Sequence, residues 1–237
     1  MNKSPLGPRL KAVAELVSSG AILADVGTDH GYLPIYLLEC GKIERAVLSD
    51  INSGPLEKAK VNVKLHNLEG RVEFRLTNGA KELADLGVTD YAICGMGGEL
   101  IAEIISAAPC LKAPGVSLIL QPMSRPEAVR RYLWESGFIV TDEVYSAEDG
   151  KLYLCIRAEF ADEKKSFTTA EEFFGEARFI DPDNPHQGEY IKGKLRALMR
   201  AKDGKKLGGM DTAFEDGLIE YAKSVLDLYF PTSGEKI

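Results

Sequence analysis

The sequence predicts an α/β fold in which a mostly parallel sheet is closed by an antiparallel hairpin and followed by a small helical hairpin. Three observations support this prediction. Short apolar runs alternate with amphipathic helical patterns between residues 9 and 136. Two later apolar runs, Phe138–Tyr145 and Leu152–Phe160, are joined only by the polar loop Ser146–Lys151, which is too short for a helical crossover. Two further amphipathic helical patterns surround a glycine-rich turn near the end of the chain.

The first predicted elements alternate between helix and strand. In Arg9–Val17, apolar side chains recur at helical spacing and define one face of a helix. Ala21–Val26 is an apolar run that predicts a strand, and Leu33–Cys40 continues with helical character. Arg45–Ile51 predicts the second strand. A further helix is expected to open at Pro55, because proline suits the first turn of a helix.

The same alternation continues over the next elements. Val72–Leu76 alternates as a third strand, and Tyr91–Cys94 predicts a fourth strand that is followed by a helix over Leu100–Ala107. Val116–Leu120 is uninterruptedly apolar, as expected for a parallel strand that is buried on both faces. The pattern of Glu127–Ser136 predicts another helix before the antiparallel hairpin begins.

The remaining chain predicts a second, smaller unit. Ala161–Ala170 is polar and resembles a linker, whereas Gln187–Lys202 carries a helical apolar stripe. Glycines within Gly204–Gly209 are expected to break this helix before a last amphipathic helix. We therefore expect one domain over residues 1–160, and a linker with a helical hairpin over residues 161–237.

Composition limits the classes of protein to consider. The chain has 237 residues, a formal net charge of −7 and 45% hydrophobic residues, which is enough for a substantial core. No apolar run approaches the roughly 18 residues that a membrane span needs. Residues 1–8 lack the apolar core of a signal peptide, and the four cysteines show no metal-ligand spacing. We therefore expect a cytoplasmic protein with no membrane partner and no metal.

The segment Asp25–Pro34 follows the first predicted strand and leads into a helix. Gly27 and Gly31 lack a Cβ, so a turn built on them lets the backbone approach a ligand closely. Asp50 ends the next strand, where a carboxylate takes ribose hydroxyls in nucleotide-binding α/β folds. Together these features predict a ligand with an adenosine part, although each alone also fits a tight turn or a helix cap.

Two further turns follow later strands. Asn78-Gly79 comes after the third strand, and it fits either an ordinary turn or a contact with an adenine ring. Gly95-Met96-Gly97-Gly98 follows the fourth strand. Its glycines predict an open shelf at the crevice where the strand order reverses. There, Met96 would pack beside a cofactor or a substrate base.

The late antiparallel hairpin narrows the fold family. A parallel α/β sheet closed in this way is typical of class I S-adenosylmethionine methyltransferases. A nicotinamide-binding Rossmann domain would more usually finish with another parallel unit. Because unrelated functions share one fold, the function has to be argued from the site.

Four segments resemble the bacterial tRNA (adenine-22-N1)-methyltransferases of the TrmK type, namely Ala24–Pro34, Ser49–Ala59, Cys94–Gly98 and Ile119–Pro122. The resemblance covers residues 9–160 well and extends more loosely through the C-terminal helical hairpin, which is similar to the coiled-coil appendage of the family. Methyltransferases in general carry a glycine where Asp29 stands, but aspartate is what this family shows. The family tends to carry an aspartate where this chain has Asn78.

The resemblance implies methyl transfer from S-adenosyl-L-methionine to N1 of adenine 22 in the D-arm of tRNA, without a metal. Adenine N1 holds an in-plane lone pair and needs no deprotonation, so the task is positioning and removal of water. This atom lies on the Watson–Crick edge, so a paired base must first be exposed. The cofactor-binding residues that the resemblance implies are Asp25, Gly27, Asp29, Gly31, Asp50, Asn78, Gly79, Gly95, Met96 and Gly97.

The implied catalytic residues are Asp29, His30, Tyr32 and Gln121. Asp29 would stabilise the positive charge that develops on the methylated base, acting electrostatically or as a base. His30 would contact the base or stabilise its own turn, and Tyr32 would stack on the base or pack. Gln121, at the carboxyl end of a strand, presents both a donor and an acceptor. The chain lacks the Asx-Pro-Pro-aromatic string of exocyclic-amine methyltransferases after the fourth strand, which argues against attack by N6.

Basic side chains gather in one predicted helix and its turn, opposed there only by Asp203. Such a stripe on an acidic protein either binds a polyanion, here tRNA, or is a solvated helix face. We expect a monomer or a weak dimer. The basic residues are Lys192, Lys194, Arg196, Arg200, Lys202, Lys205 and Lys206.

Two rival functions remain at this point. One is a methyltransferase of a small molecule or a protein, with the helical hairpin used for dimerisation. The basic stripe speaks against it, because dimer seams are rarely so charged. The other is a non-catalytic RNA-binding or nucleotide-binding adaptor, which cofactor-dependent methyl incorporation would exclude.

Overall fold

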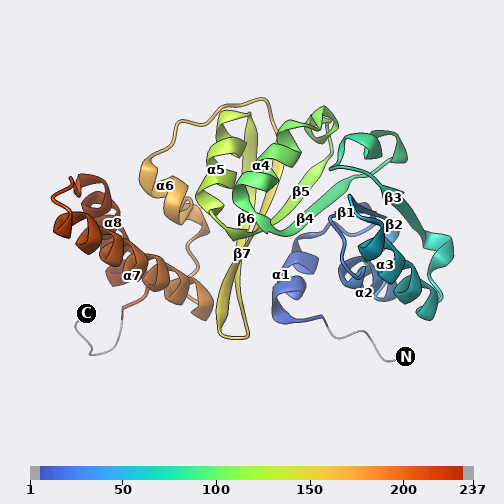
Figure 1. Cartoon of the computed structure of the whole chain (residues 1–237), viewed down its shortest axis with the longest axis horizontal. Helices are drawn as coiled ribbons and strands as arrows, with labels where there is room; N and C mark the ends of the chain where they lie inside the picture. The colour runs from blue at the N-terminus through green and yellow to red at the C-terminus, as the bar shows by residue number, and fades with distance from the viewer. Residues whose placement is uncertain (1–5, 232–237) are drawn as a thin grey trace.

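The computed structural model describes residues 6–231. In this part of the chain, seven strands form one sheet in the order β3-β2-β1-β4-β5-β7-β6 (Figure 1). The strands are parallel except β7, which runs antiparallel to both of its neighbours. This is the parallel sheet with a closing hairpin that the sequence predicts. The strands are β1 Ala21–Val26, β2 Ile43–Asp50, β3 Val72–Leu76, β4 Asp90–Gly97, β5 Ser117–Ser124, β6 Phe138–Glu148 and β7 Lys151–Phe160.

Helices cover both faces of the sheet, and short 3₁₀ turns connect some of the elements (Figure 1). The helices are α1 Pro8–Leu16, α2 Tyr32–Glu39, α3 Ser53–Leu65, α4 Gly98–Ser106, α5 Pro126–Glu135, α6 Thr169–Phe174, α7 Pro185–Leu207 and α8 Ala213–Tyr229. The 3₁₀ turns are η1 Glu69–Arg71, η2 Lys81–Leu86, η3 Pro109–Lys112 and η4 Ala177–Phe179.

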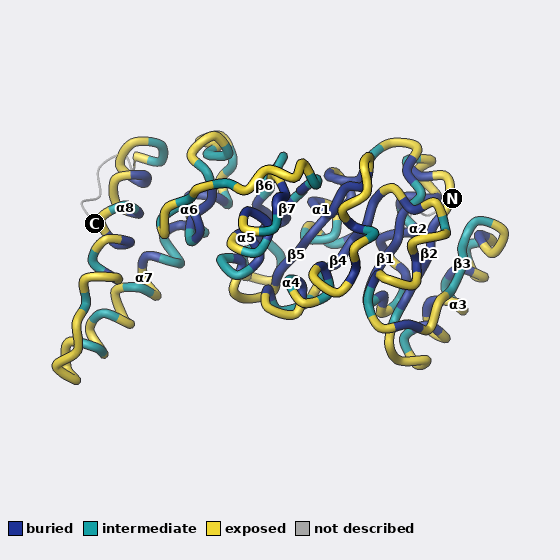
Figure 2. Tube along the Cα trace, turned by 90° about the horizontal axis from the view of Figure 1, so that it is seen from above, coloured by how far each residue is buried: buried dark blue, intermediate teal, exposed yellow. Residues whose placement is uncertain are grey.

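Two cores lie on opposite faces of the sheet. Leu23 of β1 packs in the core under α1, α2 and α3, whereas the next residue, Ala24, packs in the core under α4 and α5. Both residues are fully buried, because successive side chains of a strand point to opposite faces. The central strands β1, β4 and β5 are therefore buried at consecutive positions, as Figure 2 shows for the dark blue centre of the molecule.

The closing hairpin is tighter than the sequence predicts. Strands β6 and β7 pair up to Glu148 and Lys151, so the turn is Asp149-Gly150 rather than the longer loop Ser146–Lys151. Both turn residues have positive φ, at 50° and 72°, which is the geometry of a tight hairpin turn. Since β7 runs antiparallel to β5, the tip of this hairpin lies at the carboxyl edge of the parallel strands.

The C-terminal segment is attached to the sheet domain by a buried arginine. Arg130 of α5 is fully buried and donates hydrogen bonds of 2.6 and 2.7 Å to both carboxylate oxygens of Glu143 on β6. It also donates to the backbone oxygens of Glu172 and Phe173 in α6. A buried guanidinium with carboxylate and carbonyl partners fixes α6 against both elements.

Beyond α6, the helices α7 and α8 form an antiparallel hairpin with a core of its own. Helix α7 continues through Gly204 and ends before Gly208, so the expected break at Gly204 is wrong. A single helical glycine costs only about 1 kcal/mol, which the packing of α8 offsets. Within residues 6–231, no helix combines the length and the apolar character that crossing a membrane requires.

Candidate functional site

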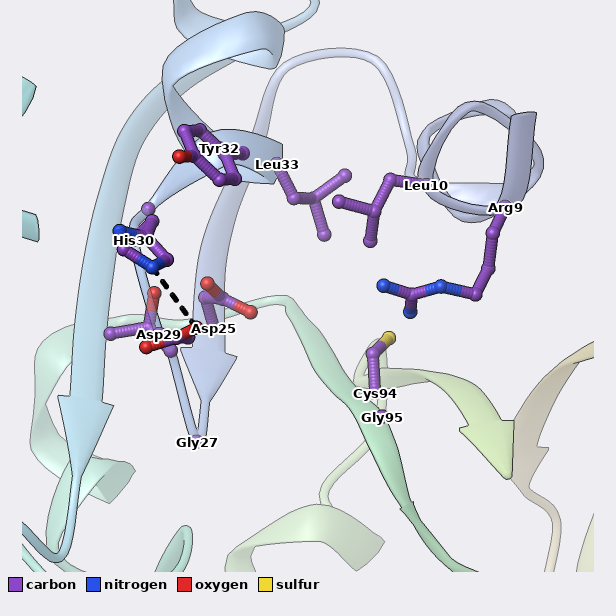
Figure 3. A pocket seen from close by; sticks show the side chains of 12 residues that line it. Arg9, Leu10, Asp25, Gly27, Asp29, His30, Tyr32, Leu33, Cys94 and Gly95 are labelled. Carbon is purple, nitrogen blue, oxygen red and sulfur yellow. Dashed lines mark ion pairs between the residues drawn. The ribbon is translucent and has the colours of Figure 1, made fainter. Parts of the chain in front are cut away.

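A cavity of about 310 Å³ opens at the carboxyl ends of β1 and β4 (Figure 3). Helix α1 forms one wall, and the loop between β1 and α2 forms the opposite wall. In open α/β sheets, ligands bind at this edge, where the strand order reverses. The lining residues are Arg9, Leu10, Asp25, Gly27, Thr28, Asp29, His30, Gly31, Tyr32, Leu33, Cys94 and Gly95.

The glycines of the β1–α2 loop are required by its geometry. Gly27 and Gly31 adopt φ values of 79° and 70°, which favour glycine. A Cβ on Gly27 would overlap the terminal methyl group of Met96, and a Cβ on Gly31 would lie 2.9 Å from a methyl group of Leu48. The backbone N–H groups of Gly27 and Thr28 both donate to the Ser49 carbonyl, which holds the loop against β2.

Asp25 supplies a buried carboxylate at the end of β1. Figure 3 shows the carboxylate pointing into the cavity. Burial, with a smaller contribution from the nearby charge of Asp50, raises the pKa of Asp25 to about 6. An acid held this way gains stabilisation when a cationic group binds beside it. The cavity is therefore prepared for a ligand that carries a positive charge.

Asp29, His30 and Tyr32 form the rim of the cavity. The Asp29 carboxylate lies 3.2 Å from Nε2 of His30 and 3.8 Å from the ammonium of Lys58. The imidazole of His30 stacks on the ring of Tyr32, with centroids 5.1 Å apart and planes 14° from parallel. Tyr32 is 47% exposed, so one aromatic surface stays open to solvent. The structure thus brings three of the four expected catalytic residues together.

Gln121 does not take the position that the sequence suggests. Its side chain is fully buried in β5, so the expectation that it presents an amide to a base edge is corrected. Its Oε1 accepts a 2.7 Å hydrogen bond from Nη1 of Arg9, and its Nε2 donates to the Pro122 carbonyl and to the sulfur of Met123. Strand β5 continues to Ser124, which places Gln121 inside the strand.

The expected adenosine contacts lie beside the cavity and not in its lining. Asp50 accepts a 2.7 Å hydrogen bond from the backbone of Asn52 and is partly buried at the end of β2. The backbone N–H of Thr77 donates to the Asp50 carbonyl, which brings the exposed Asn78 and the following Gly79 next to the end of β2. These residues lie at the same carboxyl edge of the sheet as the cavity.

The glycine-rich segment after Cys94 lines the cavity and allows neighbouring loops to pack closely. Gly95 lines the cavity with a φ of 78°, and burial raises the pKa of the Cys94 thiol well above its ordinary range, so the thiol is neutral. Met96 packs against Gly27, and Gly97 ends β4. A Cβ on Gly98 would overlap the backbone of the loop that follows β5, so the last glycine allows two loops to meet.

Most of the expected basic stripe is paired with acidic groups. Lys192 and Lys194 lie 2.8 and 3.0 Å from the carboxylates of Glu189 and Glu127. Lys202 and Lys205 pair with Asp216 and Glu215 of α8, at 2.5 and 2.8 Å. Within residues 6–231, the cations that form no ion pair on this helix are Arg196, Arg200 and Lys206.

The sequence did not single out Arg9 as a site residue. Arg9 lies in α1, yet it lines the cavity and contacts a residue of β5 far along the chain. No motif marks it, because the contact depends on how α1 packs. In the part of the chain that the structure describes, no group of histidine, cysteine or acidic side chains has the arrangement of a metal site.

Comparison with known proteins supplies an independent line of evidence. A family model described as a methyltransferase domain matches residues 6–156. The tRNA (adenine(22)-N(1))-methyltransferase of Bacillus subtilis (strain 168) is 35% identical over 167 residues, which cover 70% of this chain and 70% of that protein.

Solved structures extend the likeness over nearly the whole chain. Streptococcus pneumoniae Sp1610 in complex with S-adenosyl-L-methionine superposes with a TM-score of 0.79 at 32% identity, covering 92% of this chain and 98% of that one. The B. subtilis m1A22 tRNA methyltransferase TrmK superposes with a TM-score of 0.74 at 27% identity, covering 95% and 97%. The likeness therefore includes the C-terminal helices as well as the sheet.

Proposed function

We propose that this chain, which belongs to the family of bacterial tRNA (adenine(22)-N1)-methyltransferases, transfers a methyl group from S-adenosyl-L-methionine to N1 of adenine 22 in the D-arm of tRNA. The cavity at the ends of β1 and β4 is the observation that carries the proposal. It combines a buried carboxylate with an open aromatic rim, at the edge of the sheet where nucleotide ligands bind.

The residues present fit S-adenosyl-L-methionine. The carboxylate of Asp25 suits the cationic end of the cofactor, and Asp50 suits the ribose hydroxyls at the neighbouring strand end. The buried hydroxyl of Thr28 lines the same cavity as Asp25 and can donate a hydrogen bond to a ligand. Asn78 and Gly79 would border the adenine ring. When bound, the cofactor supplies an electrophilic methyl group on a sulfonium.

We propose that the residues at the rim of the cavity hold the target base. The stacked pair of His30 and Tyr32 offers an exposed aromatic surface on which an extruded adenine would stack. Asp29 lies next to this pair, where its negative charge would stabilise the positive charge of the methylated adenine. N1 needs no base to remove a proton, so Asp29 is assigned an electrostatic role.

The C-terminal hairpin is the proposed docking surface for the body of the tRNA. Arg196 and Arg200 are exposed, are one helical turn apart and form no ion pair within residues 6–231. They and Lys206 are therefore better placed to contact phosphates than the paired lysines of the same helix. We propose that the enzyme acts in the cytoplasm, where tRNA is found, as a monomer or a weak dimer.

Nucleoside analysis by mass spectrometry tests the proposed function. Unmodified tRNA is incubated with the protein and the cofactor, digested and examined for 1-methyladenosine. We expect one methyl group per tRNA, and none in a matched transcript that carries guanine at position 22. Methylation of the control at another position would refute the assigned target. If the tRNA is not methylated when the cofactor is present, the protein is instead an adaptor or a methyltransferase of another substrate.

A further inference from the structure

Arg9 is held in the cavity by partners from three strands. Its Nη1 donates to Gln121 of β5 at 2.7 Å, and its Nε lies 3.6 Å from a carboxylate oxygen of Glu148 at the tip of β6. The guanidinium carbon lies 5.7 Å from the centre of the Tyr153 ring on β7. The side chain is only 23% exposed. These contacts orient a cation that lies outside the glycine motifs of the sequence.

The guanidinium keeps donors for a ligand. The bond to Gln121 uses one N–H, and a guanidinium carries several more in a planar fork. Gln121 is neutral, so this bond orients Arg9 without cancelling its charge. Glu148 does offset part of the charge, but at 3.6 Å it is beyond hydrogen-bond distance. A planar fork of this kind binds a carboxylate through two parallel hydrogen bonds.

Arg9 and Asp25, two of the charged residues that line the cavity, enter it from different sides. Figure 3 shows Arg9 reaching in from α1 and the carboxylate of Asp25 pointing in from β1. No ion pair joins the two residues within the described chain, although both line the same cavity. A ligand that satisfies both must carry a positive and a negative group on one short segment. An amino-acid end, with its ammonium and carboxylate on one carbon, has this pattern.

We infer that Arg9 binds the carboxylate of the methionine part of S-adenosyl-L-methionine, while Asp25 faces its ammonium group, and that Gln121 acts as the positioning residue of Arg9. The inference rests on the cofactor of the proposed function. It also explains why an amide is buried in β5 at the edge of a cofactor cavity: its carbonyl oxygen fixes the orientation of the guanidinium.

Binding calorimetry with two ligands tests the inference without any catalytic turnover. Decarboxylated S-adenosylmethionine keeps the ammonium, sulfonium and adenosine groups and lacks only the carboxylate. The unaltered protein should bind S-adenosyl-L-methionine about 10- to 100-fold more tightly than the decarboxylated compound, the range expected for a charge-assisted contact. Equal affinities would overturn the inference, and this comparison needs no variant to fold.

Variants then assign the effect to Arg9. Arg9→Met keeps the length of the side chain, and it should lower the affinity for S-adenosyl-L-methionine to about that of the decarboxylated compound. The affinity for the decarboxylated compound should change by less than about twofold. Arg9→Lys should retain part of the preference. An equal loss for both ligands in Arg9→Met would show that Arg9 only supports the fold of α1.

Two controls complete the design. Arg45→Met removes an exposed arginine near the amino end of β2, and it should leave both affinities unchanged. Gln121→Met should weaken binding of S-adenosyl-L-methionine and spare the decarboxylated compound, because its effect passes through Arg9. If instead it weakens both ligands equally, Gln121 does not position Arg9. Methylation of tRNA at position 22 is measured separately. Binding of the carboxylate by Arg9 and the proposed function can therefore fail independently.

Discussion

Replacing Asp25 with asparagine should make the free protein more stable and a poorer binder of the cofactor. Burial, together with the charge of Asp50, raises the pKa of Asp25 from 3.8 to about 6. A pKa difference of this size corresponds to a free-energy difference of about 3 kcal/mol between the charged and neutral forms of the side chain. The buried charged carboxylate therefore lowers the stability of the free protein relative to a neutral side chain at the same position. Asparagine removes the charge at nearly the same volume.

The direction in which stability changes with pH follows from the pKa difference between the folded and unfolded protein. Between pH 3.8 and about 6, the folded protein holds a proton on Asp25 that the unfolded chain has lost. The contribution of Asp25 to stability is therefore greatest in acid and falls as the pH rises through this window. Binding of the cofactor should follow the opposite course. Its ammonium group needs the charged carboxylate, so affinity should weaken as the pH drops below about 6.

Urea denaturation and calorimetry between pH 4 and 7.5 measure both trends. The Asp25→Asn variant should be more stable than the unaltered protein at pH 7.5 by up to about 3 kcal/mol, with the difference shrinking toward pH 4. It should bind S-adenosyl-L-methionine more weakly at pH 7.5 and lose the pH dependence of binding below pH 6. A stability difference that does not vary across this pH range would refute the assignment of the titrating group to Asp25.

Three further predictions concern the loops, the catalytic rim and the RNA surface. Gly98→Ala should destabilise the protein by about 1–3 kcal/mol in urea denaturation, because its Cβ would overlap the loop after β5, and an unchanged midpoint would contradict the close packing. Asp29→Asn should lower the single-turnover methylation rate, measured at saturating cofactor, by about 10- to 100-fold, and an unchanged rate would remove the electrostatic role. Replacing Arg196 and Arg200 together with alanine should weaken the binding of tRNA, as measured by filter binding. The slope of log affinity against log salt concentration should flatten by about one unit per lost phosphate contact. Lys192→Ala should weaken tRNA binding less, because Glu189 already pairs with Lys192. Equal losses of affinity would contradict the difference between paired and unpaired cations.

Much of the fold could be predicted because strands that are buried on both faces are apolar at consecutive positions. The bounds of β1 agree with the predicted apolar run, those of β3 agree with the predicted alternating run, and the late hairpin indicates the antiparallel β7. Helix ends were less predictable where several capping signals compete. Pro55 suggested the start of a helix, but α3 begins two residues earlier, at Ser53. Gly204 suggested a break, yet packing against α8 carries α7 past it.

Within the candidate site, the sequence indicated the loops but not the partners of their side chains. Asp29, His30 and Tyr32 come together because they are near neighbours on one turn. The contact between Arg9 and Gln121 joins positions that are 112 residues apart, and it depends on the packing of α1 beside the sheet. The basic residues of α7 show the same limit. A helix that is crowded with cations in sequence is largely neutralised by acidic residues that the fold brings from elsewhere.

The buried arginine of α5 links the two proposed functional surfaces. Arg130 joins β6, through Glu143, to the backbone of α6, and α6 packs on the helical hairpin through Phe174. The far end of β6 reaches the cavity, where Glu148 lies beside Arg9. Breaking a buried pair of this kind costs about 3–5 kcal/mol, so detaching α6 from β6 is disfavoured. The helical hairpin is therefore held at a set position relative to the cofactor cavity. For an enzyme that acts at one nucleotide of a folded RNA, such fixed spacing offers a means of selecting the position, because only a base at the matching distance from the docked phosphates reaches the rim.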